Sequence, residues 1–247
     1  MTPGSHLASQ REHTWTGDRA QLARRLVRLL QRLIGSTNSE IKARRQAALE
    51  HRTDSRRWTD PGGYNPQSAA RLSLAVEMLG GAEWVCDIGC ANQDLRRILP
   101  SNTIYLPMDI KPWTEDTIVC DVNQRVLPVD YVRLADLTFV VGVLEYLFDP
   151  AWLLSELAAS TEGIIISYNV AELSTIRRAD NGWVNDFTTE QVNALIEAAG
   201  FRIEDTRLYR GSELIIKATN PTFDSATKRQ MKRAQFLGVG LKAVPAQ

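Results

Sequence analysis

Short apolar segments alternate with amphipathic ones through the middle of the chain. Five of the apolar segments have the length of buried strands: residues 84–88, 103–109, 117–121, 137–142 and 163–168. Alternation of strands with helices predicts a mostly parallel sheet that helices cover on both faces. Two further strand-like segments follow the last helix and are joined at Arg210-Gly211. Because so tight a turn cannot join parallel strands, the pattern predicts a doubly wound α/β sheet of seven strands with an antiparallel terminal hairpin.

Helix-start patterns indicate where several helices begin. Asp149-Pro150 offers a capping carboxylate followed by a proline, and Thr188–Gln191 has the spacing of a capping box. A helix that begins near Asn65-Pro66 is expected to open the main domain. Residues 94–99 are also expected to be helical. Residues 52–63 are rich in Pro, Gly and Asp and predict a loop.

The two ends of the chain differ in character from its middle. Residues 18–34 form a basic amphipathic pattern, and a second helix is expected from Thr37 to about His51. A basic helix is expected at about 225–236. The predicted organisation has three parts: an N-terminal basic helical extension over residues 1–63, a main domain over residues 64–220, and a C-terminal helix and tail over residues 221–247.

The net charge of zero hides an uneven distribution. Residues 1–75 carry 13 Lys and Arg against 6 Asp and Glu, whereas residues 76–247 carry 16 against 23. Three cysteines lie in or beside predicted strands without the spacing of metal ligands, which indicates reduced, buried thiols. No apolar run approaches the roughly 18 residues that a spanning helix needs, and the first residues lack the apolar segment of a signal peptide. A cytoplasmic location is therefore expected.

Acidic residues end the first three predicted strands. Asp87 lies in the first strand, just ahead of a turn at Gly89, and Asp109 and Asp121 end the next two. The carboxyl ends of parallel strands meet at one edge of the sheet, where doubly wound proteins bind their ligands. An acid about 20 residues beyond the first strand can accept both ribose hydroxyls of an adenosine. With Gly142 at the end of the fourth strand, the series predicts an adenosine-containing cofactor.

Several motifs of the main domain occur together. Val-Cys-Asp-Ile-Gly-Cys-Ala spans the first strand and turn, Leu-Pro-Met-Asp109 ends the second strand, and Cys-Asp121-Val122 ends the third. The segment Val-Gly-Val-Leu-Glu-Tyr-Leu-Phe-Asp-Pro at 141–150 is the most specific, because dehydrogenases lack it. Over about residues 64–218 the chain resembles the class I S-adenosylmethionine-dependent methyltransferases that act on small molecules. The resemblance implies a Rossmann-like methyltransferase fold, S-adenosylmethionine as cofactor, and a small acceptor such as a sugar or glycan precursor.

The resemblance also implies roles for individual residues. The residues that would bind the cofactor are Tyr64, Asp87, Gly89, Ala91, Asp109, Ile110, Asp121, Val122, Gly142 and Val143. Of these, Asp109 would hold the ribose hydroxyls, Asp121 would accept from the adenine amino group, and Asp87 would be oriented toward the cofactor's amino group. The residues that would contact the acceptor are Tyr146, Asn169, Trp183 and Asn185. The candidate catalytic residues are Tyr146, Tyr168 and Glu145, and none of them stands out as a general base.

The turn after the first strand departs from the family's pattern. Ala91 and Gln93 stand where the family usually has glycines. Ala91 adds a methyl group at a position of close approach, and Gln93 is expected either to leave the positive-φ region or to be slightly strained. A degenerate member that binds no cofactor and serves as a partner protein is therefore an alternative. An NAD(P)-dependent oxidoreductase is another, disfavoured because no Tyr/Lys or His/Asp pair follows the fourth strand.

The basic N-terminal helices allow three interpretations. They cover the cofactor cleft, they bind an anionic acceptor such as a nucleotide-linked or lipid-linked sugar, or residues 18–34 bind a membrane surface. His51 is expected to be a surface residue. Binding to nucleic acid is disfavoured, because the main domain is acidic and the chain has no basic stripe rich in aromatic residues.

Overall fold

The computed structural model describes three stretches of the chain: residues 38–59, 68–224 and 244–245. The predicted helices at 18–34 and 225–236 lie outside the described residues, and so does Tyr64.

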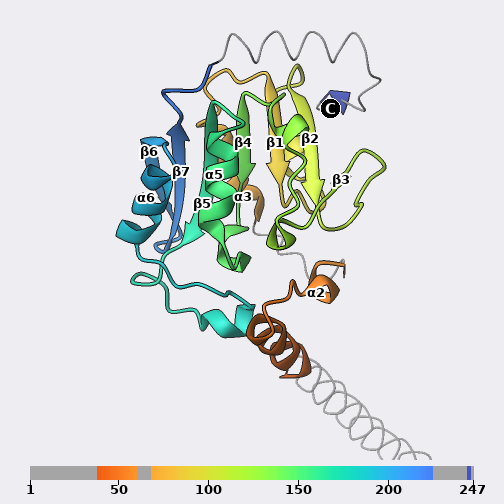
Figure 1. The fold of residues 1–247 in the computed structure, drawn as a ribbon, viewed down its shortest axis with the longest axis vertical. Helices are drawn as coiled ribbons and strands as arrows, with labels where there is room; N and C mark the ends of the chain where they lie inside the picture. Colours follow the sequence, from red (N-terminus) through yellow and green to blue (C-terminus); the bar gives the residue numbers. More distant parts are fainter. Residues whose placement is uncertain (1–37, 60–67, 225–243, 246–247) are drawn as a thin grey trace, which may run out of the picture.

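Seven strands form the predicted sheet, in the order β3-β2-β1-β4-β5-β7-β6 (Figure 1). Their bounds are β1 Trp84–Ile88, β2 Ile104–Asp109, β3 Ile118–Val119, β4 Leu137–Val140, β5 Gly163–Asn169, β6 Arg202–Tyr209 and β7 Glu213–Thr219. The strands β1 to β5 pair in parallel, and β7 is antiparallel to both β5 and β6. The predicted fold class is therefore confirmed. A two-residue strand, β8 Val244–Pro245, pairs antiparallel with β2 and is an eighth strand of the same sheet.

Helices cover both faces of the sheet, as predicted. The helices α5 (Pro150–Ala158) and α6 (Thr189–Ala198) pack on one face, and α3 (Ser68–Val76) packs on the other (Figure 1). Neighbouring strand residues alternate between the two cores: Tyr105 belongs to the core beneath α3, and Leu106 to the core beneath α5 and α6. The parallel strands are thus apolar on both sides, which explains their continuous apolar runs.

The helix caps and the hairpin turn predicted from the sequence are present in the structure. Asp149 caps α5 by accepting a hydrogen bond from the backbone N–H of Trp152, and Thr188 and Gln191 form a complete capping box on α6. Between β6 and β7, Arg210 and Gly211 have φ of 49° and 76°. Positive φ at both central residues is the geometry of the two-residue hairpin turn that matches strand twist.

Two predictions of local structure are wrong. Residues 94–99 contain only a single 3₁₀ turn, and part of the loop predicted at 52–63 is helical. The short helical segments are α2 Ser55–Thr59, α4 Val129–Val132, η2 Leu95–Arg97, η3 Val122–Gln124, η4 Leu144–Tyr146 and η5 Arg178–Asn181. Pro100 follows η2 so closely that residues 95–99 have no room for a longer helix.

The described part of the N-terminal extension lies at the carboxyl ends of the parallel strands. Residues 38–49 form a helix, in agreement with the second predicted helix, and α2 follows it. Figure 1 shows both beneath the edge of the sheet at which β1 and β2 end. None of the described helices is long and apolar enough to cross a membrane.

Candidate functional site

A pocket lies at the carboxyl ends of β1 to β4, where the sheet topology changes direction. It encloses about 110 Å³, and about 660 Å³ with the adjoining open space. The predicted cofactor-binding residues that line it are Gly89, Ala91, Asp109, Ile110, Asp121, Val122, Gly142 and Val143. Residues from four separate loops, chosen on the sequence alone, therefore meet at one place. Thr53, Trp58 and Trp113 also line the pocket, and the sequence pattern had not indicated them.

Asp109 lies at the end of β2 and holds the turn that follows β1. Its Oδ2 accepts a hydrogen bond from the backbone N–H of Ala91 at 2.9 Å, and its Oδ1 accepts one from the backbone N–H of Lys111 at 3.3 Å. Burial raises the pKa of Asp109, and these hydrogen bonds partly offset the effect. The carboxylate is half-buried at the pocket wall, where it can accept further hydrogen bonds from a ligand.

Asp121 ends the segment after β3 and is bonded to the N-terminal extension. As the N-cap of η3 it accepts from the backbone N–H of Asn123 at 3.0 Å. The hydroxyl of Thr53 donates to the same Oδ1 at 3.1 Å, and Gln124 donates to Oδ2 at 3.1 Å. Thr53 therefore links the extension to a residue of the pocket that lies 68 positions away in the sequence.

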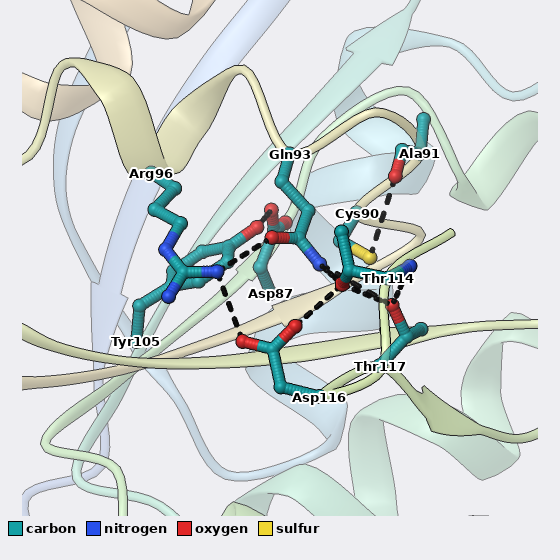
Figure 2. A network of polar contacts seen from close by, with 9 residues as sticks. All are labelled: Asp87, Cys90, Ala91, Gln93, Arg96, Tyr105, Thr114, Asp116 and Thr117. Atoms are coloured by element: carbon teal, nitrogen blue, oxygen red, sulfur yellow. Dashed lines mark hydrogen bonds and ion pairs between the residues drawn. The ribbon is translucent and has the colours of Figure 1, made fainter. Parts of the chain in front are cut away.

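Asp87 does not line the pocket but lies just beneath it. Its side chain is 5% exposed, and its Oδ2 accepts a hydrogen bond from the hydroxyl of Tyr105 at 2.5 Å (Figure 2). Burial raises the pKa of Asp87 to about 7, against the opposing effect of the Tyr105 hydrogen bond. Asp87 is thus a carboxyl group that titrates near neutral pH below the first turn.

The first turn keeps positive φ at two positions where the resemblance leads us to expect glycine. Ala91 has φ of 44° and Gln93 has φ of 60°, so Gln93 remains in the positive-φ region and is strained there. Figure 2 shows what holds it: the Gln93 amide nitrogen donates to the hydroxyls of Thr114 at 2.6 Å and Thr117 at 3.2 Å. Its oxygen accepts from Arg96 at 3.0 Å, and Arg96 also pairs with Asp116. This network offsets the strain that a glycine would avoid.

Replacing Gln93 with alanine should lower the free energy of unfolding by about 2–3 kcal/mol, because it removes the hydrogen bonds to Thr114, Thr117 and Arg96 that offset the strained φ. Glycine should cost about 1 kcal/mol less than alanine, since it removes the strain but not the loss of hydrogen bonds. Chemical denaturation measures both. Gln46→Ala, which removes one exposed hydrogen bond to Glu50, should change stability by less than about 0.5 kcal/mol. Equal stability of the alanine and glycine variants would refute the strain at Gln93.

The turn after β4 is held by a polar network on the α3 side. The backbone N–H of Gly142 donates to the hydroxyl of Ser167 at 2.9 Å, and that hydroxyl donates to Glu213 at 2.7 Å. Arg71, on α3, pairs with Glu213 at 2.9 Å. A Cβ at Gly142 would lie 2.8 Å from the Arg71 guanidinium. Gly142 has φ of 72°, which favours glycine, and a side chain there would require the Arg71 guanidinium to move. Nothing in the sequence had marked Arg71, Ser167 or Glu213.

Two candidate catalytic residues follow this turn on η4. Tyr146 lines the pocket, its hydroxyl oxygen accepts from Arg57 at 3.2 Å, and its ring meets that of Trp58 edge-on at 4.7 Å. Burial raises the pKa of Tyr146, so it stays protonated at neutral pH. Glu145 is 2% exposed, and its Oε1 accepts from the backbone N–H of Asn169 at 2.9 Å. Burial, followed by repulsion from Glu213, raises the pKa of Glu145 to about 7.

The other predicted residues beyond β5 lie away from the pocket. Tyr168 is fully buried in the core beneath α5 and α6 because it shares a strand face with Ile164 and Ile166. Its hydroxyl donates to Asn185 at 2.5 Å, and Asn185 in turn donates to the carbonyls of Leu144 and Leu147. The structure therefore does not bring Tyr168, a catalytic candidate, or Asn185, a predicted acceptor contact, to the pocket. They tie the loop after β5 to the loop after β4.

Asn169 and Trp183 do not line the pocket either. The backbone N–H of Asn169 donates to Glu145, and its carbonyl accepts from Arg178. The Arg178 guanidinium also lies over the ring of Trp183, 4.6 Å from the ring centre. The side-chain oxygen of Asn169 and the indole nitrogen of Trp183 are buried and have no hydrogen-bond partner among the described residues. Of the four predicted acceptor contacts, the structure brings only Tyr146 to the pocket.

No protein-family model matches the chain, and no curated protein matches it. Solved structures with similar folds include two methyltransferases and one domain with bound S-adenosylhomocysteine. Magnesium protoporphyrin IX methyltransferase from Synechocystis, with S-adenosylhomocysteine (SAH) bound, is 17% identical over 67% of this chain and 92% of its own, with a TM-score of 0.49. The N-terminal domain of EvdMO1 with SAH bound is 17% identical over 65% of this chain and 84% of its own, with a TM-score of 0.46. Human N-acetylserotonin methyltransferase, in complex with S-adenosylmethionine, is 19% identical over 61% of this chain and 51% of its own, with a TM-score of 0.47.

Proposed function

We propose that the protein transfers a methyl group from S-adenosylmethionine to a small-molecule acceptor. The observation that carries this proposal is the meeting of Asp109 and Asp121 on one apolar-walled pocket at the carboxyl ends of the parallel strands. A pocket of this kind suits an adenosine, whose hydroxyls and amino group are donors and whose ring has two apolar faces.

The residues of the pocket fit the cofactor in three places. Asp109 is placed to accept from the ribose hydroxyls, and Asp121 from the adenine amino group, where the hydroxyl of Thr53 now donates. Ile110, Val122 and Leu147 provide apolar contacts for the base. The cofactor supplies an activated methyl group. What the chain has to provide is orientation of the two reactants and exclusion of water.

The pocket favours this cofactor over a nicotinamide dinucleotide. A dinucleotide fold binds the pyrophosphate at the N-terminus of a helix that directly follows the first strand. Here β1 is followed by the three-residue 3₁₀ segment η2, which provides no such helix end. The oxidoreductase alternative thus lacks its phosphate site among the described residues. The alternative of a partner protein that binds nothing is decided by a binding measurement.

Isothermal titration with SAH and with NAD⁺ tests the proposal. We expect saturable binding of SAH, one molecule per chain, and none of NAD⁺. Absence of SAH binding at millimolar concentration would remove the methyltransferase proposal and favour the non-catalytic alternative.

The class of acceptor is a separate part of the proposal. A sugar or glycan precursor is the class suggested by the sequence resemblance, and transfer of a radiolabelled methyl group to a panel of free and nucleotide-linked sugars tests it. If the protein binds SAH but labels none of these sugars, sugars and glycan precursors are excluded as acceptors, and other small molecules remain.

We also expect the affinity for SAH to depend on pH through Asp87. Its pKa of about 7 means that the carboxyl group gains a proton as the pH falls through neutrality. The protonated group no longer attracts the cofactor's ammonium, so the Kd for SAH should rise below pH 7, by at most about tenfold per pH unit. Titrations between pH 5.5 and 8.5 measure this. Asp87→Asn should bind more weakly and with a flatter profile. An unchanged profile in that variant would show that Asp87 is not the titrating group.

A further inference from the structure

A shallow cleft adjoins the pocket on the side of the N-terminal extension. The cleft encloses about 20 Å³, and about 320 Å³ with its open space. Thr53, Trp58, Asn123 and Tyr146 line both the cleft and the pocket, so the two adjoin each other. The pocket beside the cleft is the one that Gly142 and Val143 also line.

The cleft is rich in positive charge. Arg44, Arg52 and Arg57 line it, against the single acid Asp54. Arg44 and Arg52 pair with exposed acids of their own helix or loop, Glu40 and Glu50. Arg57 differs, because it makes no ion pair with any described residue and its side-chain partners are neutral.

Arg57 is also held in place at the boundary between cleft and pocket. One of its nitrogens donates to the carbonyl of Asn181 and another to the hydroxyl of Tyr146, at 3.2 Å for the latter. Its guanidinium lies 4.5 Å from the ring centre of Trp58 and 5.1 Å from that of Tyr146. No carboxylate among the described residues neutralises this half-buried cation, so its charge is available to a bound anion. Arginine is well suited to binding an anion, since the two parallel N–H groups of its planar guanidinium bind carboxylate or phosphate oxygens.

We propose that this cleft is the acceptor site and that the acceptor carries a carboxylate or phosphate group held by Arg57. The proposal rests on the proposed methyl transfer and adds the chemical class of the acceptor. Trp58, Tyr146 and Phe148 offer apolar faces for the body of the acceptor beside its charged group.

The test is a titration of the SAH-saturated protein with phenyl phosphate, benzoate and neutral benzyl alcohol, followed by saturation-transfer NMR of each probe. We expect at least one of the two anions to bind and benzyl alcohol not to bind. Arg57→Gln should weaken anion binding at least about tenfold, because it removes a charge-assisted hydrogen bond. Arg57→Lys keeps the charge and should lose less. Binding of phenyl phosphate alone would identify a phosphate site, and binding of benzoate alone a carboxylate site.

Arg56→Gln is the matched control. Arg56 is the neighbouring arginine on α2, it is exposed, and it lines neither the cleft nor the pocket. The Arg56→Gln variant should bind the anions as the wild type does. Thermal unfolding of each variant tests whether its fold is intact. The proposal is overturned if neither anion binds, or if both bind Arg57→Gln as tightly as the wild type. If SAH fails to bind, the proposed function fails, and the same titration without SAH still decides the anion site.

Discussion

Replacing Asp109 with alanine is expected to weaken the binding of SAH at least about tenfold. The carboxylate lies at the pocket wall, where charge-assisted hydrogen bonds to two ribose hydroxyls would each contribute about 1.5–3 kcal/mol. Asp109 also accepts from the backbone N–H of Ala91, so the alanine variant loses the support of the first turn. Isothermal titration with SAH measures the combined effect.

Asp109→Asn separates the two contributions. Asparagine keeps an oxygen for the backbone of Ala91 but removes the charge and the oxygen that accepts from Lys111, so stability should fall less than in the alanine variant while SAH binding still weakens. Asp130→Ala is the control, because Asp130 lies on α4 with an exposed side chain that pairs with Arg133 and does not line the pocket. It should bind SAH as the wild type does. Normal binding by Asp109→Ala would mean that the ribose is held elsewhere.

Replacing Gly89 with alanine is expected to lower the free energy of unfolding by about 2–4 kcal/mol and to weaken SAH binding as well. Gly89 has φ of 79°, and a Cβ there would lie 2.4 Å from Cγ2 of Val143. That contact is far inside van der Waals distance, so the turns after β1 and β4 would have to separate. Both turns line the pocket. Chemical denaturation and titration with SAH measure the two effects.

Gly211→Ala is a control that measures the cost of a positive φ alone, without a steric clash. Gly211 has nearly the same φ, 76°, but a Cβ there would have nothing within 4 Å. This variant should lose only about 1–2 kcal/mol, the cost of the left-handed conformation. Adding Val143→Ala to Gly89→Ala should restore part of the stability, because it removes the clashing methyl group. Equal losses at Gly89 and Gly211 would contradict the close approach of the two turns.

The sequence predicted best what short-range patterns determine. The acids at strand ends are one example, because strand direction alone places Asp109 and Asp121 at the same edge of the sheet. The capping box at Thr188 and the turn at Arg210-Gly211 are others, since each depends on residues a few positions apart. Together with the family resemblance, these patterns selected eight residues that line one pocket.

The missed features depend on contacts between distant segments. Thr53 and Trp58 reach the pocket from the extension, and neither has a spacing that links it to Asp121 or Tyr146. The direction of the Tyr168 side chain could not be predicted, because a strand that is buried on both sides shows no alternation by which to orient it. The strain at Gln93 was anticipated, but its compensation by Thr114 and Thr117, more than 20 residues later, was not.

The most direct measurement of the central claim is a crystal structure of the protein grown with SAH. We expect SAH in the pocket at the carboxyl ends of β1 to β4, with both ribose hydroxyls on Asp109 and the adenine amino group on Asp121. SAH bound elsewhere on the molecule, or in this pocket with its ribose away from Asp109, would contradict it.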